Sequence, residues 1–87
     1  MESIPDDLKK KYIERRQTDL NECLSHLKSK NFTSLEKLGH KMKGNGGTFG
    51  YLIITKIGDK IEKGSKTKNE PLIQEALKEL ASWIKSN

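Results

Sequence analysis

Apolar residues recur at intervals of three or four positions along almost the whole chain, in four stretches that short polar segments separate. This spacing puts the apolar side chains of each stretch on one face of an α-helix, whereas a strand would alternate them every second residue. The stretches are Ile4, Leu8, Tyr12, Ile13, Leu20, Cys23, Leu24 and Leu27; then Leu35, Leu38, Met42 and Phe49; then Ile53, Ile54, Ile57 and Ile61; and finally Leu72, Ile73, Ala76, Leu77, Leu80, Ala81 and Ile84. We therefore predict an all-α fold.

Residues that favour helix ends stand at the borders of these stretches. Pro5 and Pro71 suit first helical turns, where proline loses no hydrogen bond. Thr33 or Ser34, followed by Glu36, is a candidate N-cap for the second helix. We expect the connections to fall at residues 29–31, near Gly50 and at residues 64–69.

Four amphipathic helices with short connections predict an antiparallel up-and-down four-helix bundle. The chain has 87 residues, enough for a single modest core but not for a second lobe, so residues 1–87 are expected to form one domain. Polar residues 15–19 interrupt the apolar face of the first helix.

The charge and the cysteine content limit the class of protein without choosing a partner. The net charge of +5 arises from 17 basic and 12 acidic residues. The basic residues, Arg15 and Arg16 among them, are interleaved with acids as on solvated helix faces. A single cysteine, Cys23, cannot form an internal disulfide, which is typical of the reducing cytoplasm. The longest apolar run covers residues 51–54, far short of the roughly 20 residues of a membrane helix. We expect a soluble cytoplasmic monomer.

Five of the seven glycines lie within residues 38–50, around His40. At about 100° per residue, His40 points about 200° away from both Leu38 and Met42, so its imidazole faces water when they face the core. A glycine in a helix interior costs about 1 kcal/mol relative to alanine. The concentration of glycines around an exposed histidine therefore needs a physical reason.

The helix face that carries His40 is nearly bare. Positions three, four and seven residues after it share that face, and they are Lys43, Gly44 and Gly47. Gly39 and Gly46 lie beside them, at positions where we expect no demand from packing. We infer that another molecule approaches the imidazole closely and that side chains would block it.

The residue types suit one particular chemistry. Neutral imidazole is a nucleophile near neutral pH. Lys37, Lys41 and Lys43 surround His40, and their charges disfavour its protonated form. The same lysines attract an anionic group that is transferred to the ring, for which phosphoryl is the best candidate. The residues themselves therefore favour reversible phosphorylation of His40.

The segment from His40 to Gly44, with Gly50 six residues later, matches the signature H-x-[LM]-K-G-x5-G. This signature resembles that of histidine-containing phosphotransfer (HPt) domains of multistep phosphorelays. The resemblance covers nearly the whole chain and looks like one bacterial branch of the family. It is carried further by Leu8, Tyr12 and Arg15-Arg16, by Leu38-Gly39, by residues 48–51 (Thr-Phe-Gly-Tyr), and by Ile57-Gly58 followed by Ile61-Glu62.

The resemblance implies that His40 accepts a phosphoryl group from a phospho-aspartate of one receiver domain and passes it to another. In the family, the lysine matching Lys43 neighbours the phosphorylated imidazole, and the glycine matching Gly44 leaves room for the receiver. The glycine matching Gly50 allows a tight turn after the histidine helix. Met42 departs from the commoner leucine, a volume-conserving change in the core.

We therefore expect a phosphocarrier without an ATP site or kinase activity of its own, whose partners are response-regulator receiver domains and a hybrid histidine kinase. The chain itself needs no cofactor, because magnesium would belong to the receiver. His40 is the predicted phosphoryl acceptor, and Lys43 is its electrostatic support. The predicted docking surface consists of Lys37, Lys41, Gly44 and Gly47, with an apolar rim of Leu35, Phe49 or Tyr51.

Four alternatives use other features of the sequence. A metal site would rest on Cys23 and His26 alone, without a further cysteine or an acidic cluster, so we expect none. A nucleotide loop is disfavoured because residues 44–50 (GNGGTFG) lack both phosphate-binding glycine signatures and no strand precedes them. A basic bundle that binds nucleic acid remains open, although the aromatic residues do not interleave with a basic cluster. A protein-interaction module without phosphotransfer also remains open.

Overall fold

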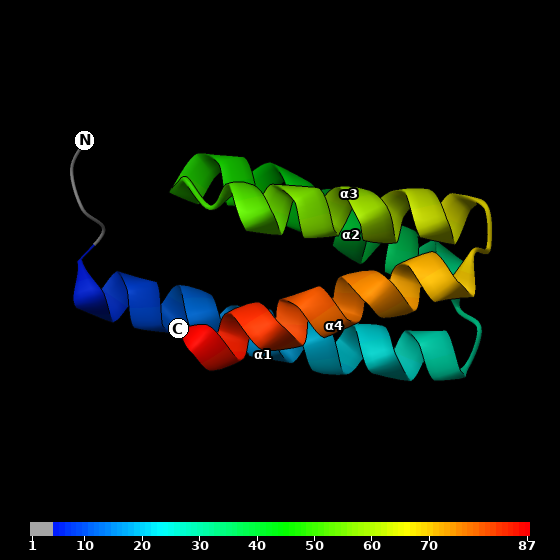
Figure 1. Ribbon diagram of the computed structural model, residues 1–87, viewed down its shortest axis with the longest axis horizontal. Coiled ribbons are helices and arrows are strands. Elements are labelled where there is room, and N and C mark those ends of the chain that lie inside the picture. Colours follow the sequence, from blue (N-terminus) through cyan, green and yellow to red (C-terminus); the bar gives the residue numbers. More distant parts are fainter. Residues whose placement is uncertain (1–4) are drawn as a thin grey trace.

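The computed structural model describes residues 5–87, which form four α-helices joined by short connections (Figure 1). Successive helices run in opposite directions, and each packs against two neighbours, α1 and α3 both lying against α2 and α4. The predicted all-α, antiparallel up-and-down four-helix bundle is confirmed. Ile4, the predicted start of the first apolar stretch, lies outside the described residues. The helices are α1 (Asp6–Lys28), α2 (Phe32–Phe49), α3 (Leu52–Lys66) and α4 (Glu70–Ser86).

The helix starts follow the chemistry of capping residues. Pro5 directly precedes α1, and Pro71 lies in the first turn of α4 as predicted. The predicted cap of α2 was wrong, because Asn31, not Thr33 or Ser34, is its N-cap. The Asn31 side chain accepts a hydrogen bond from the backbone N–H of Ser34 at 3.2 Å. The helix begins earlier than expected since Phe32 already packs against the core.

The predicted connection at residues 64–69 is shorter in the structure, because α3 continues to Lys66. Gly64 is buried beneath the start of α4, where a Cβ atom would lie 2.8 Å from Ile73 Cγ1. Ser65 is also buried, and its hydroxyl donates to the Ile61 carbonyl at 2.6 Å. Gly64 and Ser65 therefore lie in α3 and pack against the rest of the bundle, rather than forming a loop. The chain then turns through Lys68, whose φ of 54° is left-handed.

The core contains most of the predicted apolar positions, with exceptions at the ends and on one edge of the bundle. Leu8 and Phe49 are partly exposed, and Figure 1 shows the first turns of α1 projecting beyond the other helices. Leu24 and Ile53 are also exposed. Within residues 5–87, no helix is both long and apolar enough to cross a membrane. The core is formed by Tyr12, Leu20, Cys23, Leu27, Leu35, Met42, Ile54, Ile57, Ile61, Ile73, Ala76, Leu77 and Leu80.

Two residues of the polar interruption of the first helix are not solvated as its composition suggested, whereas Arg15, Gln17 and Thr18 are exposed. Arg16 and Asp19 are both buried, and Arg16 Nε donates to Asp19 Oδ2 at 2.7 Å. Arg16 Nη1 and the Tyr12 hydroxyl both donate to Asn45 Oδ1, at 3.2 and 2.9 Å. Because buried polar groups need partners, this set of bonds fixes α1 against α2.

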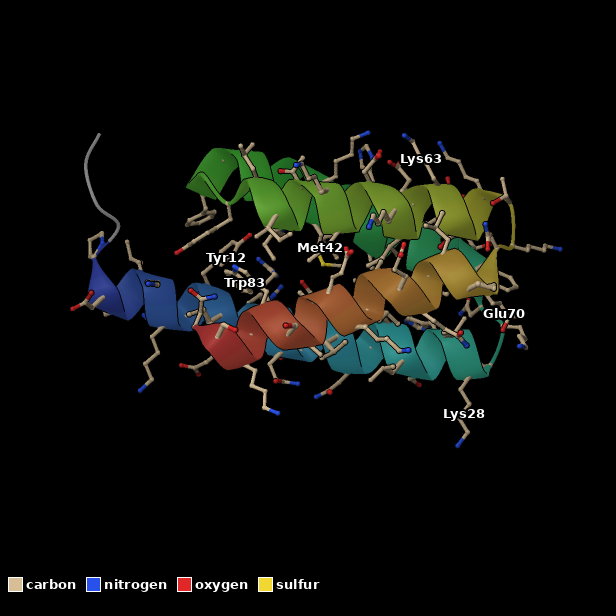
Figure 2. The ribbon with its side chains drawn as sticks, viewed as in Figure 1. Tyr12, Lys28, Met42, Lys63, Glu70 and Trp83 are labelled. Atoms are coloured by element: carbon tan, nitrogen blue, oxygen red, sulfur yellow. The ribbon has the colours of Figure 1, made fainter. Side chains whose placement is uncertain are left out.

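An aromatic cluster closes the same end of the bundle. Tyr12 lies at its centre, with ring centroids 4.7 Å from Phe49, 5.0 Å from Tyr51 and 6.1 Å from Trp83. Tyr12 and Trp83 come from α1 and α4 and meet in the interior, as Figure 2 shows. The Arg16 guanidinium lies 4.4 Å from the centroid of the Tyr12 ring, so cation–π attraction adds to the packing.

The closest helix pair is α2 and α3, and glycines bring them together. A Cβ atom on Gly39 would lie 2.6 Å from the backbone nitrogen of Glu62, and one on Gly46 would lie 2.6 Å from that of Thr55. A Cβ on Gly58 would clash with the backbone nitrogen of Lys43. The expectation that packing does not require Gly39 and Gly46 was therefore wrong, because backbone meets backbone at both positions.

Candidate functional site

The imidazole of His40 lies on the solvent-facing side of α2, and 73% of its side-chain surface is exposed. This agrees with the geometry expected from the spacing of Leu38 and Met42. Its Nδ1 lies 2.9 Å from Glu62 Oε2 on α3. When the carboxylate is ionised, Nδ1–H is the donor, so the proton of the neutral ring is on Nδ1 and the lone pair is on Nε2.

Glu62 reaches the imidazole because α2 and α3 approach so closely. Gly58 lies one turn before Glu62 and faces the α2 backbone, while Gly39, next to His40, faces the backbone of Glu62. The Glu62 side chain is only 12% exposed. Burial raises the pKa of this carboxyl, but the hydrogen bond from His40 and the nearby positive charges outweigh that effect and lower the pKa below its ordinary value. Glu62 is therefore a fixed, ionised acceptor.

Lys43 is held by carboxylates of α3. Its Nζ lies 3.1 Å from Asp59 Oδ1 and 3.7 Å from Glu62 Oε1. The second oxygen of Asp59 lies 2.9 Å from Lys63 Nζ. The hydrogen bond to Asp59 raises the pKa of Lys43, and the bonds from Lys63 and Lys43 lower the pKa of Asp59. Both shifts favour the charged forms of Lys43 and Asp59.

These ion pairs change the electrostatic picture derived from the sequence. Lysines alone were expected to surround His40 and to disfavour its protonated form. The charged group in hydrogen-bonding contact with the ring is instead the Glu62 carboxylate, and Lys43 is balanced by Asp59.

The glycines around His40 fall into two groups. Gly39 and Gly46 serve helix packing, whereas a Cβ on Gly44 would meet nothing within 4 Å. A Cβ on Gly47 would meet only Thr55 Oγ1, at 3.9 Å. Gly44 and Gly47 therefore leave the backbone of α2 uncovered beside the imidazole, as expected for those two positions.

The remaining predicted site residues have the following positions. Lys37 and Lys41 are exposed, and with Glu36, His40 and Glu62 they line a shallow pocket of about 530 Å³. Gly50 ends α2 with a left-handed φ of 80°, a conformation that glycine adopts without strain.

The predicted apolar rim is only partly exposed. Leu35 is completely buried, so its proposed contact with a partner was wrong. It faces the core because it lies one helical turn before Gly39, on the side of α2 that meets α3. Phe49 is 38% exposed and Tyr51 is half-buried.

Cys23 and His26 do not form a site together. Cys23 is completely buried, and burial raises the pKa of its thiol to about 12. His26 lies at the bundle surface, half-buried. Across residues 5–87, no three His, Cys, Asp or Glu side chains are grouped so that they could hold a metal ion.

Sequence reasoning missed the contribution of α3. The sequence alone placed Asp59 and Glu62 among the acids of solvated helix faces, and Glu62 also in the family resemblance, because helix periodicity does not tell which residues of two helices meet. One signal was present in the sequence. Gly58 directly precedes Asp59 and lies one turn before Glu62, so a small residue marks the face of α3 that another backbone approaches.

The family model described as the Hpt domain matches residues 7–85, nearly the whole chain. No curated protein and no solved structure matches the chain.

Proposed function

The chain belongs to the Hpt domain family, and on that premise we propose that it is a phosphocarrier in a multistep phosphorelay. His40 accepts a phosphoryl group from the phospho-aspartate of one receiver domain and passes it to a second receiver. The observation that carries this proposal is an exposed imidazole whose Nδ1 is hydrogen-bonded to Glu62, beside the backbone of α2 that Gly44 and Gly47 leave uncovered.

The acceptor atom in this proposal is Nε2. Its lone pair attacks the phosphorus of the receiver's phospho-aspartate, an N–P bond forms, and the P–O bond breaks so that its electron pair leaves on the aspartate carboxylate. The proton on Nδ1 stays in place throughout, so the phosphorylated ring carries a positive charge. Glu62 stabilises that charge through the 2.9 Å contact, and the reverse sequence delivers the phosphoryl group to the next aspartate.

Gly44 and Gly47 leave space beside the imidazole for the receiver domain. In-line transfer requires the receiver's aspartate to come within bonding distance of Nε2, and a side chain on that face of α2 would hold the receiver away. Lys37 and Lys41 are exposed cations beside the ring, which suit the acidic pocket of a receiver. Lys43 supplies positive charge to the transferred phosphoryl group.

The groove between α1 and α2 extends the proposed docking surface. Leu8 and Phe49 provide exposed apolar area there, and Lys11 and Arg15 add positive charge. The partners in this proposal are receiver domains and a hybrid histidine kinase, and any magnesium ion is the receiver's. The carrier itself acts as a cytoplasmic monomer without kinase activity.

The test uses the two histidines as a matched pair. The wild-type chain, His40→Gln and His26→Gln are incubated with a panel of phosphorylated receiver domains, and acid-labile phosphate is mapped by mass spectrometry. We expect phosphate on His40 in the wild type and in His26→Gln, and none in His40→Gln. A chain that accepts no phosphate from any receiver, or accepts it equally after His40→Gln, refutes the proposal.

A further inference from the structure

Lys43, which follows His40 by one turn of α2, is already engaged in the unphosphorylated chain. Its Nζ lies 3.1 Å from Asp59 Oδ1 and 3.7 Å from Glu62 Oε1. The other oxygen of Glu62, Oε2, makes the 2.9 Å contact with His40, and the 3.7 Å separation from Oε1 is longer than the one from Asp59. Asp59 is therefore the principal partner of Lys43.

A phosphoryl group on Nε2 of His40 would present Lys43 with a second partner. Residues three apart on a helix have Cβ atoms about 5–6 Å apart, so the long Lys43 side chain can reach either α3 or a group on the imidazole. The phosphoryl group carries about two negative charges, against one on Asp59. Because Nζ takes one position at a time, contact with the phosphoryl group weakens its contact with Asp59.

Asp59 does not lose all its partners when Lys43 moves. Its second oxygen, Oδ2, lies 2.9 Å from Lys63 Nζ. The side chains of Lys43 and Asp59 are 45% and 28% exposed, so water can solvate both groups during the change. Breaking an ion pair is strongly unfavourable when it leaves a buried charge without a partner. The exchange leaves no such charge.

We propose that Asp59 is a positioning residue that competes with the phosphoryl group of phosphorylated His40 for Lys43. This inference rests on the proposed function and extends it. Holding Lys43 in the unphosphorylated state stabilises that state, so Asp59 lowers the affinity of His40 for the phosphoryl group. The consequence is a carrier that gives up its phosphoryl group more readily to the next receiver.

The test measures the phosphoryl equilibrium between the chain and a receiver domain that phosphorylates the wild type. The receiver is charged with a small-molecule phosphodonor, the donor is removed, and the ratio of phosphorylated chain to phosphorylated receiver is read by phosphate-affinity electrophoresis. Asp59→Asn should raise this ratio about two- to fivefold, the scale of a partly exposed ion pair. Circular dichroism verifies that the variant is folded.

Glu75→Gln is the matched control. It also removes one carboxylate from a lysine that keeps a second one, since Lys60 lies 3.5 Å from Glu75 and 2.8 Å from Glu79. This pair joins α3 and α4, away from the contacts of His40, so the ratio should stay at the wild-type value. A rise equal to that of Asp59→Asn overturns the inference, because the effect would then reflect total charge alone.

A double-mutant cycle with Lys43→Met separates competition for Lys43 from the general field of Asp59. If Asp59 acts through Lys43, Asp59→Asn raises the ratio in the wild type and leaves it unchanged in the Lys43→Met background. An equal rise in both backgrounds, or no rise in the wild type, overturns the inference and leaves the proposed function intact. A wild-type chain that takes no phosphate from any receiver refutes the proposed function itself.

A second cycle avoids any variant of Lys43. Lys63→Gln removes the cation that stays on Asp59, so Asp59 should hold Lys43 more tightly and the ratio should fall. In the Asp59→Asn background the same substitution should have a smaller effect. Equal falls in both backgrounds contradict the competition and assign the effect of Lys63 to its charge alone.

Discussion

Gly58→Ala is the substitution that most directly tests how the site is built. A Cβ atom there would clash with the backbone nitrogen of Lys43 and lie 2.6 Å from the carbonyl oxygen of Gly39. Neither atom can rotate away, so α3 would have to move outward from α2. Since Glu62 is one turn further along α3, this movement would also separate its carboxylate from His40.

The expected loss of stability can be worked out from two opposing effects. Overpacking costs about 1–3 kcal/mol, and a clash with backbone belongs at the upper end of that range. Alanine is a better helix former than glycine by about 1 kcal/mol. The net loss is about 2 kcal/mol, which lowers the melting temperature by about 8–16 °C, because 1 kcal/mol corresponds to about 4–8 °C in a domain of this size.

Gly44→Ala is the matched variant, since a Cβ there meets nothing within 4 Å. Only the gain in helix propensity applies, so its melting temperature should rise by up to about 4–8 °C. Thermal unfolding followed by far-ultraviolet circular dichroism measures both variants. A Gly58→Ala chain as stable as the wild type, or a Gly44→Ala chain that loses stability, would refute this reasoning. It holds that Gly58 is needed for helix packing and that Gly44 faces open space.

Three further predictions concern other parts of the chain. Lys68→Gly should stabilise the protein by about 1 kcal/mol in urea unfolding, since Lys68 has a left-handed φ of 54°; an unchanged midpoint contradicts this. Asn45→Ala should cost about 1–2 kcal/mol in the same assay, because Tyr12 and Arg16 lose their shared acceptor; no loss would show that water replaces it. The lowered pKa of Glu62 stabilises the folded state at pH values above the ordinary pKa of the carboxyl, about 4.3. This stability is lost as the pH falls through the folded-state pKa. Melting temperatures of Glu62→Gln should therefore decline less in acid than those of the wild type, and parallel declines argue against it.

The bundle could be predicted from sequence because each helix carries its own signal. The spacing of Ile54, Ile57 and Ile61 defines a buried stripe whatever lies opposite, and Gly50 marks a helix end through its own backbone preference. The helix ends were harder to predict. Residues 64–66 look like a loop by composition, yet Gly64 is inside α3 because Ile73 of α4 packs on it.

The features of the candidate site that lie on one helix could also be predicted, whereas the contacts between helices could not. The exposure of His40 and the open space at Gly44 follow from positions on α2 alone, and both were expected. The contact with Glu62 depends on how far α3 is shifted along α2, and a single-helix pattern has no information about that shift. Arg16 and Asp19 were misassigned for a related reason, because Arg16 contacts Asn45 of α2, and the pattern of α1 alone does not show that contact.

Three glycines at the contact between α2 and α3 fix the alignment of the two helices. If either helix slid by one residue or turned about its axis, a side chain would replace Gly39, Gly46 or Gly58 at a point where only a hydrogen atom fits. His40 and Glu62 both lie on these two helices, and the 2.9 Å contact between them joins α2 directly to α3. The exposed surfaces of α1 and α4 can therefore vary in evolution without changing the residues that join His40 to Glu62.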